Sequence, residues 1–111
     1  MKVKGNFWLE NEGKSFLGKG RIDLLKNIDK HGSISKAAKD MKMSYKAAWD
    51  AVDIINNIAQ KKVVEKISGG KGGGGTRLTE YGKHIINVYE SAKKLYEEKL
   101  LEIEEYIKKE L

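Results

Sequence analysis

The chain contains no cysteine and no proline among its 111 residues. Without cysteine it can form neither disulfide bonds nor thiolate metal sites. It has no apolar run of membrane-spanning length and no signal-peptide pattern, so we expect a cytoplasmic protein with no membrane partner. The only two histidines, His31 and His84, lack a second metal ligand at helical spacing. No nucleophile, base and orienting group cluster in the sequence, so we expect a protein that is not an enzyme and holds no cofactor.

Charge is distributed unevenly along the chain. Residues 1–78 contain 16 lysines and arginines against 8 aspartates and glutamates, a net charge of +8. Residues 79–111 contain 6 against 8, a net charge of −2. A basic excess confined to one part of the chain favours a polyanionic partner. Lysine-rich faces also occur on proteins that bind no nucleic acid, so the charge alone does not decide.

Residues 33–59 predict two helices separated by a tight turn, which is a helix-turn-helix. Ser33 and Ser44 are good N-caps, one for each helix. Small side chains at Ala37 and Ala38 allow the two helices to cross closely. After Ser44 the apolar positions recur every three to four residues, which is typical of a helix with one buried face. A further helix at about residues 21–30 precedes the pair, so residues 20–59 are expected to hold three helices.

The other face of the second helix carries residues suited to contact DNA. Tyr45, Lys46, Trp49 and Asp50 project from its amino-terminal turns. Such residues, at the start of the second helix of a helix-turn-helix, lie where base edges in the major groove are read. Trp49 has a second interpretation, because a tryptophan near the edge of the apolar stripe can instead be covered by another part of the chain.

Residues 63–79 predict a β-hairpin with a glycine-rich tip, which would form a wing beside the helices. The tip contains a literal GxGxxG, but neither a following βαβ unit nor a GK[ST] sequence accompanies it, so no nucleotide cofactor is expected. As a wing, the loop would bring its backbone close to phosphates, and Lys71 and Arg77 would add positive charge. A disordered linker is the alternative interpretation of this loop.

The two ends of the chain are expected to cover the core and to dimerise. Residues 1–18 predict a cover made of a short hairpin, or of a strand and a loop, around the turn at residues 11–14. Residues 80–111 predict one helix of about 45 Å, longer than a domain of this size can cover. We therefore expect a twofold homodimer, with fraying beyond Leu100 as the alternative. The apolar stripe expected at the dimer interface comprises Ile85, Val88, Ala92, Tyr96, Leu100, Ile103 and Ile107.

The segments GSISKAAKDMKMSYKAAWDAV and SGGKGGGGTRLTEYG give residues 21–95 a resemblance to a known family. This part of the chain resembles the amino-terminal winged helix-turn-helix domain of the molybdate-responsive transcription regulators, the ModE family. It is similar, more distantly, to the DNA-binding domain of LysR-type regulators. Lys42 departs from the pattern, because the family more often has glycine in this turn; lysine is tolerable there if the turn needs no positive φ.

The resemblance implies a transcription regulator that binds double-stranded DNA sequence-specifically, related to molybdate or oxyanion metabolism. We expect one mainly α domain over residues 1–111, with a small β-hairpin wing and a long dimerisation helix. The candidate DNA-binding residues are Ser33, Ser44, Tyr45, Lys46, Trp49, Asp50, Lys71 and Arg77. The family's oxyanion-binding modules have no counterpart in these residues. A separate oxyanion-sensing protein as a further partner, a response to another signal and constitutive action are the alternatives. Structured RNA and a second protein are the alternative partners for the same scaffold.

Overall fold

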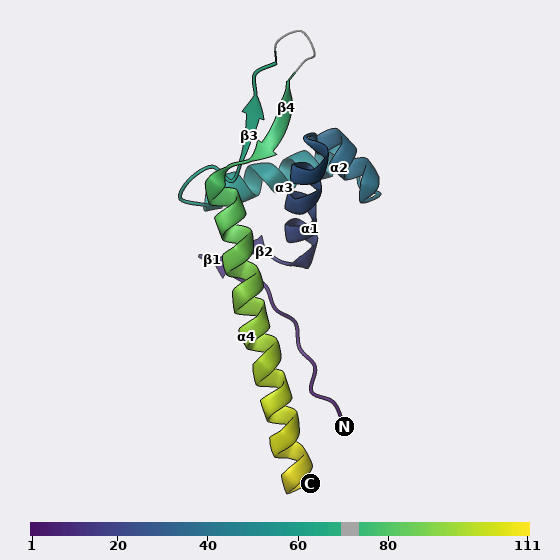
Figure 1. The fold of residues 1–111 in the computed structure, drawn as a ribbon, viewed down its shortest axis with the longest axis vertical. Helices are drawn as coiled ribbons and strands as arrows, with labels where there is room; N and C mark the ends of the chain where they lie inside the picture. The colour runs from purple at the N-terminus through teal and green to yellow at the C-terminus, as the bar shows by residue number, and fades with distance from the viewer. Residues whose placement is uncertain (70–73) are drawn as a thin grey trace.

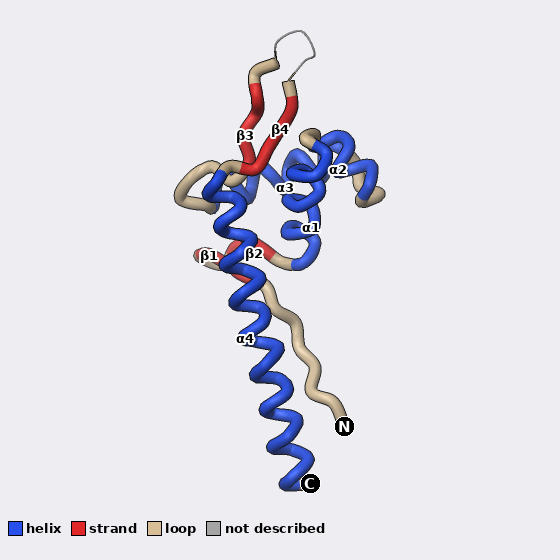
Figure 2. Tube along the Cα trace, viewed as in Figure 1, coloured by secondary structure: helices blue, strands red, loops and turns tan. Residues whose placement is uncertain are grey.

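The computed structural model describes residues 1–69 and 74–111 and has the winged helix-turn-helix fold that the sequence predicts (Figure 1). It is mainly helical, and its two short antiparallel hairpins are separated by three helices (Figure 2). In chain order the elements are β1 (Leu9–Asn11), β2 (Lys14–Leu17), α1 (Lys19–His31), α2 (Ile34–Asp40), α3 (Tyr45–Ile58), β3 (Val64–Ile67), β4 (Gly75–Leu78) and α4 (Glu80–Glu110). Among the described helices, none is both long and apolar enough to cross a membrane.

The core lies where α1, α2 and α3 meet the base of the β3–β4 hairpin, hereafter the wing. Leu25, Ile28 and Ile55 are fully buried there. Ala37 of α2 and Ala48 of α3 are also fully buried, which agrees with the expectation that small side chains let these helices cross closely. This packing fixes the direction in which α3 presents its outer face.

Three side-chain caps set the starts of the functional helices. The Ser33 hydroxyl accepts a hydrogen bond from the Lys36 amide at 3.2 Å, and the Ser44 hydroxyl accepts one from the Ala47 amide at 3.0 Å. Thr79 caps α4 by accepting from the Gly82 amide at 2.9 Å. Each cap satisfies a backbone N–H that has no partner within its helix. The caps at Ser33 and Ser44 are therefore confirmed, and α4 begins directly after Thr79.

The turn between α2 and α3 contains a residue in the left-handed conformation. A lysine was expected to fit at position 42 only if the turn needed no positive φ, and this condition is not met. Lys42 has a φ of 54°. In this conformation the Cβ of an L-residue crowds its own backbone, a cost that glycine does not incur. Lys42 therefore holds a strained position at the centre of the helix-turn-helix.

We expect Lys42→Gly to raise the free energy of unfolding by about 0.5–1 kcal/mol, because relief of the left-handed strain exceeds the extra unfolded-chain entropy of glycine. The midpoint of thermal unfolding should rise by about 2–6 °C. Lys39→Gly, at an exposed position in α2, is the matched control and should lower the midpoint. A lower midpoint for Lys42→Gly would show that its backbone is not strained.

The amino-terminal segment forms the expected hairpin, but only over part of residues 1–18. The hairpin is confined to β1 and β2, joined by a two-residue turn in which Glu12 and Gly13 both have positive φ. Residues 1–8, hereafter the strap, form no regular element and run along α4 (Figure 1). The ring of Phe7 lies 5.4 Å from the rings of both Tyr89 and Tyr96. The strap therefore covers part of the helix that was expected to be free.

A buried carboxylate holds the far end of the strap. Glu104, only 8% exposed, accepts a hydrogen bond from the Val3 amide at 2.9 Å. The ammonium of Lys2 lies 3.9 Å from the same carboxylate. Because α4 projects well beyond the core, the molecule measures 66 × 28 × 22 Å, and the strap gives the projecting half of α4 a packing partner (Figure 2).

Candidate nucleic-acid interface

The amino-terminal half of α3 lies open to solvent beside the wing. Tyr45 is 56% exposed and Trp49 is 43% exposed. A groove of about 450 Å³ separates this face of α3 from the wing. It is lined by residues that include Ile34, Trp49, Val52, Asn56, Lys66 and Thr76. A second hollow continues it past Ser33 and Tyr45 toward Gly75. Trp49 thus forms part of a groove wall. It is neither covered by another part of the chain nor fully exposed, so its position is intermediate between burial and an open DNA-facing surface.

Lys46 and Asp50 form an ion pair on the exposed face of α3. The Lys46 ammonium lies 2.8 Å from the Asp50 carboxylate, one helical turn away. The hydrogen bond that Lys46 donates to the Asp50 carboxylate, together with the negative charge of that carboxylate, raises the pKa of Lys46 above its ordinary value. The pair therefore holds the Lys46 ammonium over the outer face of the helix.

The wing is fixed to the helix-turn-helix through its β4 edge. The Thr76 amide donates a hydrogen bond to the Gly32 carbonyl at 2.9 Å, which joins β4 to the turn between α1 and α2. Arg77 pairs with Glu65 directly across the hairpin, its Nε 2.9 Å from the carboxylate. Lys71 lies outside the described residues. The structure thus places Arg77 on the wing, as expected, but already paired with an acid.

Asn56 joins α3 to the wing, a role that the sequence patterns did not indicate. Its side-chain oxygen accepts from the amides of Val63 and Val64 at 2.8 and 3.2 Å. Its side-chain amide donates to the Val64 carbonyl at 3.1 Å. Thr79, the N-cap of α4, donates at 2.6 Å to the Lys62 carbonyl just before β3. The sequence marks this role only by an asparagine next to the apolar stripe of α3. The partners of Asn56 lie outside the helix, so the helical pattern could not indicate them.

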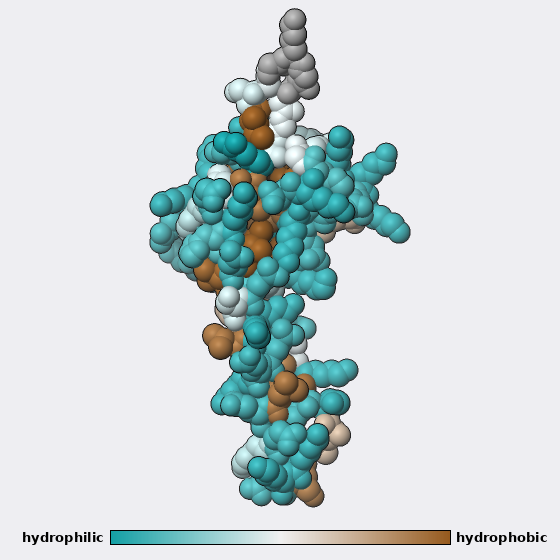
Figure 3. Space-filling model, in the orientation of Figure 1, coloured by the Kyte–Doolittle hydropathy of each residue, from teal (hydrophilic) through white to brown (hydrophobic). Residues whose placement is uncertain are grey.

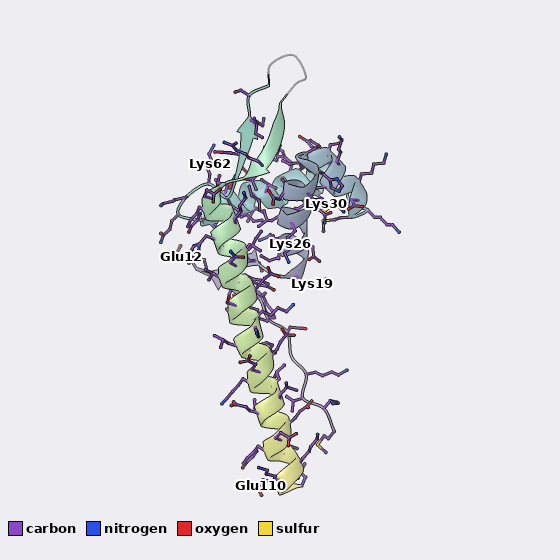
Figure 4. The ribbon with its side chains drawn as sticks, viewed as in Figure 1. Glu12, Lys19, Lys26, Lys30, Lys62 and Glu110 are labelled. Carbon is purple, nitrogen blue, oxygen red and sulfur yellow. The ribbon has the colours of Figure 1, made fainter. Side chains whose placement is uncertain are left out.

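Exposed lysines lie on the elements that neighbour α3, and two of them, Lys62 and Lys66, line the groove. Figure 4 shows Lys62 at the base of the wing and Lys30 at the end of α1. Other exposed lysines on α2, in the turn after it and on the wing are Lys36, Lys39, Lys42 and Lys66. Several acids lie among them, with Asp53 and Glu65 also lining the groove. The surface is therefore basic in excess but carries acids close to the face of α3.

The expected apolar stripe of α4 is divided between three environments. Ile85 is buried in the core, while Tyr96 packs against Phe7 of the strap. Val88 and Ile103 remain exposed. Two further exposed residues, missed from the sequence, share their side of the helix: Leu95, 68% exposed, and Tyr106, 65% exposed. Hydrophobic patches accordingly appear along the projecting part of the molecule (Figure 3). We call Val88, Leu95, Ile103 and Tyr106 the outer stripe.

Comparison with known proteins gives consistent relatives, although no protein-family model matches the chain. The chain is 44% identical over 92 residues to the "Molybdenum transport protein ModE" of Azotobacter vinelandii, covering 83% of this chain and 34% of the relative. It is 48% identical over 82 residues to the "DNA-binding transcriptional dual regulator ModE" of Escherichia coli K12, covering 74% and 31%.

A third relative carries a different name. The chain is 44% identical over 78 residues to the "Molybdenum-pterin-binding protein MopA" of Rhodobacter capsulatus, covering 70% of this chain and 29% of the relative. The chain spans about a third of the length of the curated relatives it matches. Through the part that these alignments cover, together with its winged helix-turn-helix fold, the chain belongs to the ModE family.

Proposed function

We propose that this protein binds double-stranded DNA in a sequence-specific manner and regulates transcription. The observation that carries the proposal is the open amino-terminal half of α3 beside the wing, with Tyr45, Lys46 and Trp49 exposed on it. A helix presented in this way can enter the major groove while the wing contacts phosphates. Several of the relatives are named as transcriptional regulators, which supports a binding protein without catalytic activity.

The proposed contacts divide into two kinds. Tyr45, Lys46, Trp49 and Asp50 would face base edges, because they project from the first turns of α3. The remaining candidates, Ser33, Ser44, Lys71 and Arg77, would contact the sugar-phosphate backbone, which carries no sequence information directly. On contact with a phosphate, Arg77 would either release the Glu65 carboxylate or bind both groups at once.

We further propose that two copies associate through the outer stripe of α4. Exposed apolar side chains that share one face of a projecting helix favour a symmetric helix pair. In such a pair two α3 helices would read two half-sites. Ile85 and Tyr89 of α4 belong to the hydrophobic core, and Phe7 of the strap packs against it. These contacts support treating residues 1–111 as one domain.

A role in molybdate or related oxyanion metabolism is proposed from the names of the relatives alone. The chain spans about a third of their length, and we assign the proposed DNA-binding function to its described residues. We also propose a separate oxyanion-sensing protein as a partner. A regulator of this kind would act in the cytoplasm.

Titration with duplex DNA and duplex RNA over a range of salt concentrations tests the proposal. We expect tighter binding to DNA and a logarithm of affinity that falls linearly with the logarithm of salt concentration. Lys71→Ala should reduce the slope by about one unit, while Lys109→Ala, at the far end of α4, should leave it unchanged. Tighter binding to RNA would favour the RNA alternative, and binding that ignores salt would favour a protein partner.

A further inference from the structure

We propose that Lys46 and Asp50 act as one unit that reads a single G·C base pair in the major groove, an inference that rests on the proposed function. The two side chains stand one helical turn apart on the exposed face of α3. Their charged atoms are 2.8 Å apart. The unit thus presents a donor and an acceptor side by side, at a fixed separation and in a fixed order along the helix.

The hydrogen-bonding capacities of the two groups do not overlap. An ammonium can only donate, and an ionised carboxylate can only accept. Lys46 therefore needs acceptors on its side of the base pair, while Asp50 needs a donor on its own side. Two neutral polar side chains could each rotate to donate or to accept and so match either order of base-pair groups. The ammonium and the carboxylate cannot.

Only one orientation of one base pair satisfies both groups. In the major groove guanine offers two acceptors, N7 and O6, and its cytosine offers the N4 amino donor. The O6 and N4 atoms are joined by a Watson–Crick hydrogen bond, so they lie about 2.9 Å apart, close to the separation of the Lys46 and Asp50 atoms. Reversing the pair to C·G places the donor opposite Lys46 and the acceptors opposite Asp50.

A·T pairs fail for a related reason. With adenine on the lysine side, the adenine N6 donor meets Lys46 and the thymine O4 acceptor meets Asp50, which is the wrong way round. With thymine on that side, O4 accepts from Lys46 and N6 donates to Asp50. The thymine methyl then replaces the second acceptor for Lys46, however, and adenine N7 repels the Asp50 carboxylate. The unit is therefore complementary to G·C in one orientation.

The proposal also explains why an acid lies on a surface that faces a polyanion. A lone carboxylate there would be repelled by the phosphates. Paired with Lys46, Asp50 leaves a unit of no net charge, which adds little to non-specific attraction. Its contribution would instead be to sequence preference.

The test begins with the sequences that the unaltered protein selects from random duplex DNA. We expect one G·C pair per half-site whose replacement by the other three pairs weakens binding about tenfold. Asp50→Asn should reduce that preference to about threefold or less, because an amide can donate as well as accept. Asp23→Asn is the matched control, since Lys19 and Asp23 form the same kind of pair on α1, 2.9 Å apart. It should retain the full preference.

Inosine in place of that guanine separates this mechanism from recognition of DNA shape. Inosine paired with cytosine keeps O6, N7 and N4 in the major groove and removes only the minor-groove amino group. Binding should therefore be retained. Loss of binding to the inosine duplex, or an unchanged preference in Asp50→Asn, would overturn the inference. Failure of the unaltered protein to bind any duplex DNA would instead overturn the proposed function.

Discussion

Replacing both Leu95 and Ile103 with glutamate is expected to produce a monomer that binds its operator at least about a hundredfold more weakly than the unaltered protein. The two side chains lie on the outer stripe, where they would meet a second copy. Glutamates in such a seam would be buried unpaired and close to like charges. A monomer loses the gain in affinity that comes from engaging two linked half-sites.

Sedimentation measures the association, and titration of a palindromic duplex measures its effect on binding. Leu101→Glu is the matched control, because Leu101 is 62% exposed but lies away from the outer stripe on α4. It should leave both the dimer and the affinity unchanged. A monomer at micromolar concentration for the unaltered protein, or equal disruption by Leu101→Glu, would rule out this interface.

Replacing Asn56 with alanine is expected to lower the free energy of unfolding by about 2–4 kcal/mol. The change removes three hydrogen bonds and leaves the amides of the buried residues Val63 and Val64 without their side-chain acceptor. The midpoint of thermal unfolding should fall by about 10–20 °C. Because Asn56 fixes the wing to α3, the variant should also bind DNA more weakly at temperatures where it remains folded.

The neighbouring asparagine supplies the control for this prediction. Asn57 is exposed, and its amide reaches only Asp53, at 3.4 Å. Asn57→Ala should therefore change the midpoint by no more than about 2 °C. If the two variants had equal stability, the wing would be held by other contacts, such as that between Thr76 and Gly32.

Local chemistry accounts for most of what the sequence predicted. The caps at Ser33 and Ser44 could be located because a hydroxyl followed by a periodic apolar pattern is specific to helix starts. The hairpin over residues 63–79 could be located because its β-branched strand residues and glycine-rich tip lie next to each other in the sequence. These features depend on residues only a few positions apart.

The features that were missed depend on contacts between distant residues. The strap lies along α4 because the Val3 amide meets Glu104, more than a hundred positions later in the chain. No periodic pattern marks either residue for that contact. The stripe on α4 was likewise predicted as one face, since its periodicity cannot show that Phe7 covers Tyr96 while Leu95 is left exposed.

The conformation of the turn at Lys42 was left open for a different reason. A lysine rarely adopts positive φ, whereas the glycine more common at this turn adopts it readily, so the residue type did not decide the conformation. Packing of α2 against α3 overrides this local preference, because the crossing of the two helices is set by Ala37 and Ala48.

Selection of bound sequences from random duplex DNA tests the central claim most directly. The unaltered protein is expected to enrich a palindromic motif whose half-sites are about one helical turn apart, centre to centre, or a multiple of it, as a twofold pair of α3 helices requires. Recovery of a pool no different from the starting DNA would contradict sequence-specific recognition by this face.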